Sequence, residues 1–223
     1  MVAEEGLNDL AAAVSRRLRL HGSFGVRRVR LRTAAGRLAE LERQVKRCQL
    51  CDLARTRTNV VFGEGNPEAR LVFIGEAPGQ DEDLQGRPFV GRAGELLTRI
   101  IEADRVLRMR RSDVYICNVL KCRPPGNRSP DPFEIARCLP YLFAQLEAIE
   151  ADVICCLGAV AMQALLATKE PIGRLRGRML DFRGGKLIAT YHPAYLLRNP
   201  GPEEKRKVWA DMLQVREYLD SLT

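Results

Sequence analysis

Short apolar segments alternate with helical patterns along most of this 223-residue chain. Such segments, bounded by turn residues and charged residues, are typical of buried strands. Five strands are predicted, at Leu71–Ile74, Asp113–Val119, Val153–Leu157, Met179–Phe182 and Lys186–Thr190. Strands separated by helices form a mostly parallel sheet with helices on both faces. The pattern therefore predicts an α/β fold with a short, mostly parallel central sheet.

The helical patterns lie between and after these strands. Helices are predicted at Ala93–Ala103, Phe133–Glu150, Ala159–Ala167 and Glu203–Leu222. Pro140 is expected to kink or break the second of them, because proline removes a helix hydrogen bond. Ligands of such sheets bind beyond the carboxyl ends of the strands. We therefore expect the chemistry just after Ile74, Val119 and Thr190.

The formal net charge of +8 is unevenly distributed. Residues 16–47 hold ten Arg and one Lys against two Glu, whereas residues 1–15 are acidic. We assign residues 1–40 to a basic, largely helical N-terminal extension and residues 41–223 to the main domain. The helical patterns of this region and the turn between them lie at 1–20, 33–47 and His21–Gly25. A basic arm is typical of nucleic-acid contact, although a solvated Arg-rich helix explains it equally well.

No apolar run approaches the roughly 18 residues that span a bilayer. The N-terminus carries acids where a secretory signal carries bases, and it has no long apolar stretch. We therefore expect a cytoplasmic protein with no membrane partner. In that reducing compartment, the seven cysteines are expected to bind a metal or to be buried rather than to form disulfides.

The loop after the first predicted strand, Gly75–Gly79, reads Gly-Glu-Ala-Pro-Gly. Such a turn lets backbone N–H groups approach a ligand closely, and the acids in and after it are candidate general bases or acceptors. An ordinary turn is the plain alternative. Phe89 lies in the Gly-rich loop Gly86–Gly94, where it is either a stacking platform for a flat ligand or an anchor tucked into the core.

Two further polar residues follow strands. Asn118 carries both a donor and an acceptor, so its side chain can pair with an imide or amide edge. His192 is one of only two histidines, and it lies between a predicted strand and Pro193. Single histidines are commonly structural, but this position places His192 at the functional edge of the sheet.

The cysteines give a sharper indication. Cys48 and Cys51 form a Cys-x-x-Cys pair, and Cys122 and Cys138 form a second, wider pair. Four thiolates from two pairs can hold an iron–sulfur cluster or zinc, and spacing alone does not decide between them. The remaining three are expected to be buried small hydrophobes on strands: Cys117, Cys155 and Cys156.

Taken in order, the motifs resemble the family 4 uracil-DNA glycosylases. They are Cys-x-x-Cys, Val61–Pro67, Gly75–Gly79, Gly86–Gly91, Asn118–Pro125 and Tyr191–Arg198. The likeness runs from Cys48 to Arg198 and leaves residues 1–40 outside it. It implies a three-layer α/β/α fold and a [4Fe–4S] cluster on the four cysteines Cys48, Cys51, Cys122 and Cys138.

The resemblance also implies how uracil is recognised. Phe89 stacks on the flipped base and Asn118 hydrogen-bonds its O4 and N3–H edge. Gly75 and Ala77 belong to the loop that contacts the base. Thymine must be excluded at C5; the tyrosine that does this in a sister family is replaced by Gly79, so Glu82 is our candidate.

The remaining implied roles concern catalysis and DNA. His192, with backbone N–H groups near Glu76 and Ala77, stabilises the departing uracil anion at O2. A sister family uses an aspartate at the position of Ala77 to act on the attacking water. This chain lacks that carboxylate, so the neighbouring Glu76 is the candidate that deprotonates or orients the water.

After His192, Leu196 or Leu197 is a candidate wedge into the base stack, with core packing as the alternative for Leu197. Arg198 is expected to contact phosphate. We therefore expect a monomer that acts on uracil-containing DNA. Three alternatives stay open at this point: a glycosylase of broader base range, a non-catalytic iron–sulfur DNA-binding protein, and a zinc-stabilised nucleic-acid-binding module.

Overall fold

The computed structural model describes residues 33–222, and from Ala34 onward the chain forms one compact unit. The first helix of this unit, α2 (Ala34–Lys46), confirms the helical pattern predicted over 33–47. The domain boundary predicted at residue 40 therefore falls inside a helix. The helical pattern over 1–20, the turn at His21–Gly25 and most of the basic arm lie outside the described residues.

A six-stranded sheet forms the centre of the unit, in the order β1-β3-β2-β4-β6-β5. The four inner strands are parallel, and the two edge strands β1 and β5 are antiparallel to their neighbours. The strands are β1 (Glu64–Gly65), β2 (Leu71–Gly75), β3 (Tyr115–Asn118), β4 (Val153–Leu157), β5 (Leu180–Phe182) and β6 (Gly185–Thr190). The prediction of a mostly parallel sheet is confirmed.

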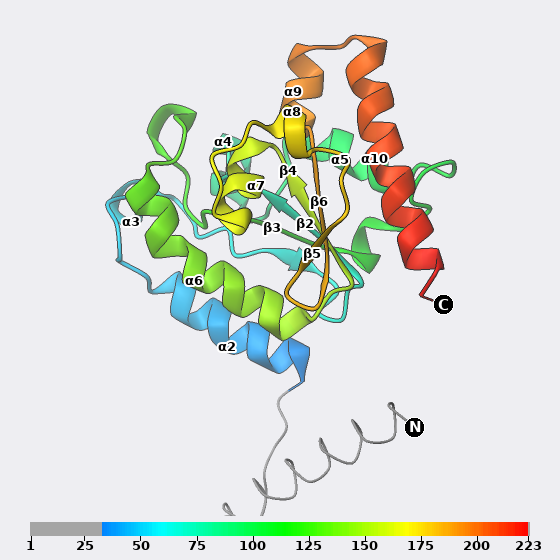
Figure 1. Cartoon of the computed structure of the whole chain (residues 1–223). Helices are drawn as coiled ribbons and strands as arrows, with labels where there is room; N and C mark the ends of the chain where they lie inside the picture. Colours follow the sequence, from blue (N-terminus) through cyan, green and yellow to red (C-terminus); the bar gives the residue numbers. More distant parts are fainter. Residues whose placement is uncertain (1–32, 223) are drawn as a thin grey trace, which may run out of the picture. The chain divides into compact units, whose positions relative to one another are not determined.

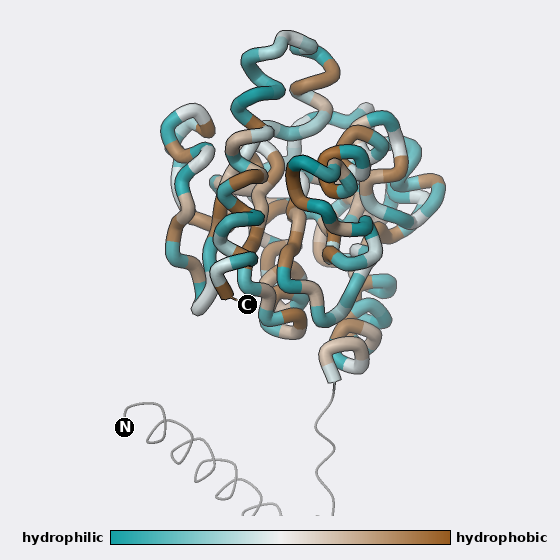
Figure 2. Tube along the Cα trace, turned by 90° about the vertical axis from the view of Figure 1, so that its right-hand side faces the viewer, coloured by the Kyte–Doolittle hydropathy of each residue, from teal (hydrophilic) through white to brown (hydrophobic). Residues whose placement is uncertain are grey.

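Helices cover both faces of this sheet, which gives the expected three layers (Figure 1). On one face lie α6 (Pro132–Ile149) and α7 (Ala159–Leu166), with α2 packed against α6. On the other lie α5 (Arg92–Glu102), α9 (Pro193–Arg198) and α10 (Pro202–Asp220). The hydrophobic residues concentrate where these layers meet (Figure 2).

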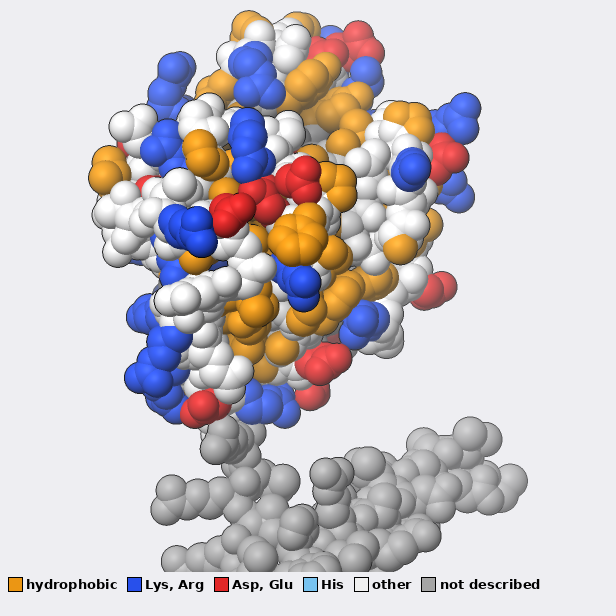
Figure 3. Space-filling view, turned by 90° about the vertical axis from the view of Figure 1, so that its left-hand side faces the viewer, with side chains coloured by type: hydrophobic (Ala, Val, Ile, Leu, Met, Phe, Trp, Pro, Cys, Tyr) orange, Lys and Arg blue, Asp and Glu red, His pale blue; other side chains and the backbone are white. Residues whose placement is uncertain are grey.

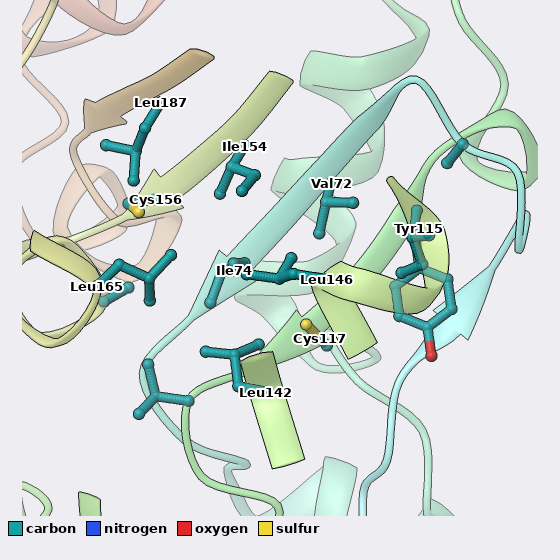
Figure 4. Packing of buried hydrophobic residues seen from close by; sticks show 14 of the residues in the cluster. Val72, Ile74, Tyr115, Cys117, Leu142, Leu146, Ile154, Cys156, Leu165 and Leu187 are labelled. Atoms are coloured by element: carbon teal, nitrogen blue, oxygen red, sulfur yellow. The ribbon is translucent and has the colours of Figure 1, made fainter. Parts of the chain in front are cut away.

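Strand β2 shows why both faces must be covered. Its residues alternate between the two cores: Val72 and Ile74 belong to the cluster under α6, whereas Leu71 and Phe73 belong to the cluster under α5 and α10. Figure 4 shows the first cluster, where Val72 and Ile74 lie among side chains from α6 and the neighbouring strands. A strand that is apolar at every position requires helices on both sides.

The remaining elements are short. They are α3 (Leu53–Thr56), α4 (Gln80–Gln85), α8 (Ile172–Leu175) and two 3-10 turns, Arg111–Asp113 and Pro125–Asn127. The sequence analysis missed α3, α4, α8, α9 and β1, because one or two turns, or two residues, carry no periodic signal. Within the described part of the chain, no helix is long and apolar enough to cross a membrane.

Of the kink or break predicted at Pro140, the break is wrong, because α6 runs continuously through this residue. Proline at this position removes only one backbone donor, and its side chain lies on the exposed side of the helix. Leu142 and Leu146 bury the opposite side against the sheet. Tertiary packing of α6 therefore outweighs the local preference of one residue.

A buried ion pair ties α10 to the end of β6. Asp211 on α10 is 1% exposed; it accepts a hydrogen bond from the Arg176 guanidinium and a 2.6 Å hydrogen bond from the Thr190 hydroxyl. Burial raises the pKa of the Asp211 carboxyl, and the bonds from Arg176 and Thr190 oppose that shift. Arg176 also donates to the Lys207 carbonyl oxygen at 2.8 Å. This network fixes the strand that leads into Tyr191 and the cleft.

We predict that Asp211→Ala lowers the free energy of unfolding by about 3–5 kcal/mol, because the Arg176 charge would stay buried without its partner. Urea unfolding checks this. The matched control is Asp181→Ala, whose side chain is 91% exposed in its pair with Lys186 and which should leave stability nearly unchanged. Equal effects of the two substitutions would contradict the role of the buried pair.

Candidate active site

A cleft lies at the carboxyl ends of the parallel strands, where the sequence analysis placed the chemistry. Its lining comes from the loops after β2, β3, β4 and β6 and from α9. Gly75 lies next to two of the lining side chains, and Leu196 lies in the core. The other predicted non-cysteine site residues all line the cleft: Glu76, Ala77, Glu82, Phe89, Asn118, His192 and Arg198.

Asn118 lies at the base of this cleft and is only 2% exposed. Gly75 is its register partner on β2. The pairing continues past Asn118, because the Val119 N–H donates to the Gly75 carbonyl oxygen at 2.9 Å and the next residue also pairs with the loop after β2. The side-chain Oδ1 has no hydrogen-bond partner within residues 33–222. A buried amide oxygen without a partner is costly, so it is suited to accept from a ligand N–H.

Gly75 allows two functional side chains to meet. A Cβ at Gly75 would lie 2.3 Å from Asn118 Oδ1 and 2.6 Å from Phe89 Cζ, which no side chain can tolerate. Phe89 itself has a φ of 52°, a left-handed conformation that is unfavourable for a bulky residue. Its ring lies 5.6 Å from that of His192 and also belongs to the core. Phe89 therefore lines the cleft and is also anchored in the core, whereas its stacking on a flat ligand stays a prediction.

Glu82 holds the Phe89 loop in place. One carboxylate oxygen accepts from the N–H groups of Val90 and Gly91, both at 2.9 Å, and the other accepts from Gly79 N–H at 3.1 Å. The side chain thus fastens the loop after Phe89 to the first turn of α4. The expected contact with C5 of a pyrimidine stays a prediction.

His192 begins α9, and its Nδ1 accepts a hydrogen bond from Ala194 N–H at 3.1 Å. This bond assigns the proton of the neutral ring to Nε2. The pKa of His192 is lowered to about 4. Burial is the main cause, the nearby Arg198 charge also lowers this pKa, and the Glu82 charge opposes both by a smaller amount. The ring is therefore a neutral donor at physiological pH.

Glu76 and Arg198 both line the cleft, and their opposite charges attract each other. Burial raises the pKa of Glu76, and the Arg198 charge opposes that shift. Arg198 thus acts on both Glu76 and His192, although the sequence analysis gave it a phosphate contact alone. A half-buried carboxylate of raised pKa is suited to accept a proton.

The burial of Leu196 argues against the DNA contact predicted for it, which stays untested. Its side chain is 4% exposed and packs in the core beneath α9. Residues along a helix turn by about 100° each, so a helix that rests on the core directs one of two successive leucines inward. Leu197 is half-buried and Arg198 is exposed.

Tyr195 and Arg128 are among the residues that line the cleft but were not predicted from the sequence. Tyr195 lies in the Tyr191–Arg198 motif, three residues after His192. Its place in that motif was the signal that could have identified it. Arg128 lies in the Pro-rich loop after β3 and pairs with Glu134 through two hydrogen bonds of 2.9 and 2.6 Å. The position of this loop after a predicted strand indicated the correct edge of the sheet, but nothing in the sequence singled out Arg128.

The four cysteines Cys48, Cys51, Cys122 and Cys138 line a separate pocket. Burial raises the pKa of the Cys138 thiol to about 11 and raises that of Cys122, to which Arg57 Nη1 donates at 3.2 Å. Within residues 33–222, no three His, Cys, Asp or Glu side chains are grouped so that they could hold a metal ion. As predicted, the other three cysteines are fully buried on strands.

The surface beside this pocket is partly apolar. Leu50 and Phe133 are exposed there, and the Arg137 guanidinium lies 4.9 Å from the centre of the Phe133 ring. Figure 3 shows the side of the molecule that carries α3, where hydrophobic side chains reach the surface among Lys and Arg side chains.

We predict that the His192 ring stays neutral from pH 8 down to about pH 5, because protonation would bury a charge. NMR of labelled histidines checks this, with His192→Gln used to assign the signal and His21 as the second histidine. The unfolded ring binds a proton below about pH 6.5, so His192 should also make the fold less stable as pH falls below that value. Titration of His192 near pH 6.5 would contradict the prediction.

Comparison with known proteins agrees with this geometry. The family model of the uracil DNA glycosylase superfamily matches residues 62–213. The chain is 50% identical over 178 residues to a type-4 uracil-DNA glycosylase of Thermotoga maritima, covering 79% of this chain and 91% of that protein. It is 48% identical over 176 residues to the type-4 enzyme of Archaeoglobus fulgidus, covering 75% and 87% of the two.

A type-5 uracil-DNA glycosylase of Thermus thermophilus is less similar, at 34% identity over 149 residues, which cover 59% of this chain and 68% of that protein. The higher identities to type-4 enzymes confirm the resemblance drawn from the motifs. This chain belongs to the uracil-DNA glycosylase superfamily and, within it, to the type-4 uracil-DNA glycosylases.

Proposed function

We propose that this protein flips uracil out of DNA and hydrolyses its N-glycosidic bond, the first step of base excision repair. The observation that carries the proposal is the buried Oδ1 of Asn118, which lies beside the Phe89 ring and has no hydrogen-bond partner among the described residues. An enzyme that acts on a base must take that base out of the stack into such a pocket. Membership of the family supports the same reaction.

Recognition of uracil rests on the paired donor and acceptor of Asn118. Its Oδ1 would accept from N3–H of uracil and its amide would donate to O4, while Phe89 stacks on the ring. Cytosine presents an acceptor and a donor in the opposite order. Binding cytosine would leave buried polar groups unpaired, which sites of this kind reject by large factors.

Thymine differs from uracil only by its C5 methyl group, so its exclusion must be steric. A Cβ at Gly79 would lie 2.7 Å from Glu82 Oε2, so the Glu82 carboxylate occupies the space beside this glycine. We assign the exclusion to Glu82, because three backbone hydrogen bonds hold its carboxylate rigidly at the cleft wall. Gly75 supports the assignment by letting the base lie close to the strand end.

Bond cleavage leaves negative charge on uracil O2. His192 is proposed to donate from Nε2 to that oxygen, together with backbone N–H groups near Glu76 and Ala77. A neutral donor suits this task because it stabilises the anion without a proton transfer. Glu76 is proposed as the base that activates or orients the attacking water, which its raised pKa supports.

DNA contact is proposed for the exposed end of α9. Arg198 is exposed at the rim of the cleft and would bind phosphate. The wedge role expected for Leu196 passes to the half-buried Leu197, which follows it in the chain.

We also propose that the four-cysteine pocket holds a [4Fe–4S] cluster. Four thiols around one pocket are the donor set of such clusters. Bound there, the cluster would cross-link Cys48 and Cys51, next to α2, to Cys122 after β3 and Cys138 on α6. Its contribution would be structural.

The experiment that tests the function uses labelled oligonucleotides with one uracil, thymine or cytosine, followed by alkali. We expect strand scission only at uracil. Asn118→Asp should lower kcat/KM by about 100-fold or more and reduce the preference for uracil over cytosine, because a carboxylate cannot donate to O4. Unchanged preference would refute the Asn118 assignment.

The control is Asn66→Asp. Asn66 Oδ1 accepts from Glu68 N–H at 2.9 Å in a surface turn, and aspartate preserves that bond. This variant should cleave uracil DNA like the wild type. No cleavage of uracil by the wild-type protein would overturn the proposed function.

For the cluster, we predict that the protein purified without oxygen is brown, absorbs near 400 nm and holds about four iron atoms per chain. Cys138→Ala should abolish the colour, because it removes one of the four thiolates. Cys156→Ala, which alters a buried strand cysteine outside the pocket, should keep it. A colourless, zinc-containing wild type would overturn the cluster.

A further inference from the structure

A buried lysine lies between the cleft and the cysteine pocket. Lys121 is 1% exposed, and its Nζ donates a 2.7 Å hydrogen bond to the backbone carbonyl oxygen of Asn118. The next residue in the chain is Cys122. The side chain of Lys121 thus folds back onto the strand end that carries the proposed uracil-reading amide.

The charge of Lys121 has no acidic partner among residues 33–222. Its one hydrogen bond goes to a neutral carbonyl, and it takes part in none of the ion pairs between described residues. Buried charges in proteins are normally paired, as Arg176 is with Asp211. An ammonium in this position therefore requires negative charge from elsewhere.

The cysteine pocket, which Lys121 helps to line, can supply that charge. Lys121 lines the pocket together with all four cysteines, and its backbone N–H donates to Cys138. Four thiolates that bind an iron–sulfur cluster form an anionic assembly. The ammonium and that assembly are complementary in charge, which is the usual reason for a buried lysine to persist.

The backbone around Lys121 is held firmly, so displacement of its side chain would be transmitted to the cleft. Val61 N–H donates to the Lys121 carbonyl oxygen at 2.8 Å, and Leu120 N–H donates to the Glu76 carbonyl oxygen at 3.0 Å. Ala77 packs against the small hydrophobic cluster of Leu53, Leu120 and Cys122 at the same place. The loops after β2 and β3, which both line the cleft, therefore meet the cysteine pocket here.

We infer that Lys121 is a positioning residue whose ammonium bridges the anionic cluster site and the Asn118 carbonyl, so that cluster binding orders the uracil-reading strand end. The inference rests on the proposed function and the proposed cluster. It gives a residue outside the base pocket control over catalysis, and it explains a buried charge that no described carboxylate balances.

The test compares full-length Lys121→Met and Lys121→Gln with wild type, purified with the cluster. Removal of a positive charge disfavours the more negative reduced cluster, so the reduction potential of both variants should shift to more negative values. Loss of the 400 nm absorbance to a chelator should be faster. kcat/KM on uracil DNA should fall by about 10- to 100-fold for Lys121→Met, and less for Lys121→Gln, which can still donate to Asn118.

The control is Lys205→Met on the exposed face of α10, which should change none of these quantities. An unchanged potential in either soluble variant would overturn the inference, whatever its activity. If both neutral variants are insoluble, Lys121→Arg, which keeps the charge, should be soluble and brown, and its failure would overturn the inference. A shifted potential in a protein that cannot cleave uracil DNA would refute the proposed function instead.

Discussion

The parallel pairing of β2 with β3 is the constraint on which the proposed active site depends. Its last register pair joins Gly75 to Asn118, and the ladder continues one step past the sheet through the Val119 N–H. Because Gly75 has no side chain, the Asn118 amide and the Phe89 ring both come within contact of the strand end. A shift of register by one residue would turn Asn118 to the opposite face.

Backbone N–H groups hold two side chains of the cleft in place. Both carboxylate oxygens of Glu82 accept hydrogen bonds from backbone N–H groups, and Nδ1 of His192 accepts one from Ala194 N–H. These bonds fix the Phe89 loop and the histidine tautomer before any ligand arrives. Electrostatic stabilisation of a departing anion benefits from this preorganisation, since the donors need no rearrangement during the reaction.

The cleft and the cysteine pocket are two sites joined by one short segment. Asn118 belongs to the first and Cys122 to the second, and Lys121 between them contacts both. A group bound by the cysteines would thus hold the chain that enters the cleft, without taking part in the reaction. The Phe89 backbone has a left-handed conformation that is unfavourable by itself, so packing elsewhere in the fold must maintain it.

The sequence by itself determined the layered α/β fold, the edge of the sheet that carries the site, and seven of the residues that line the cleft. Apolar strands that alternate with helices leave few other arrangements, and short motifs placed directly after strands meet at one edge. Only the tertiary structure decided that Leu196 is buried, that Pro140 lies within an unbroken helix, and that Lys121 lacks an acidic partner among the described residues. Helix phase, packing and the charge around a side chain depend on segments distant in sequence, which no local pattern contains.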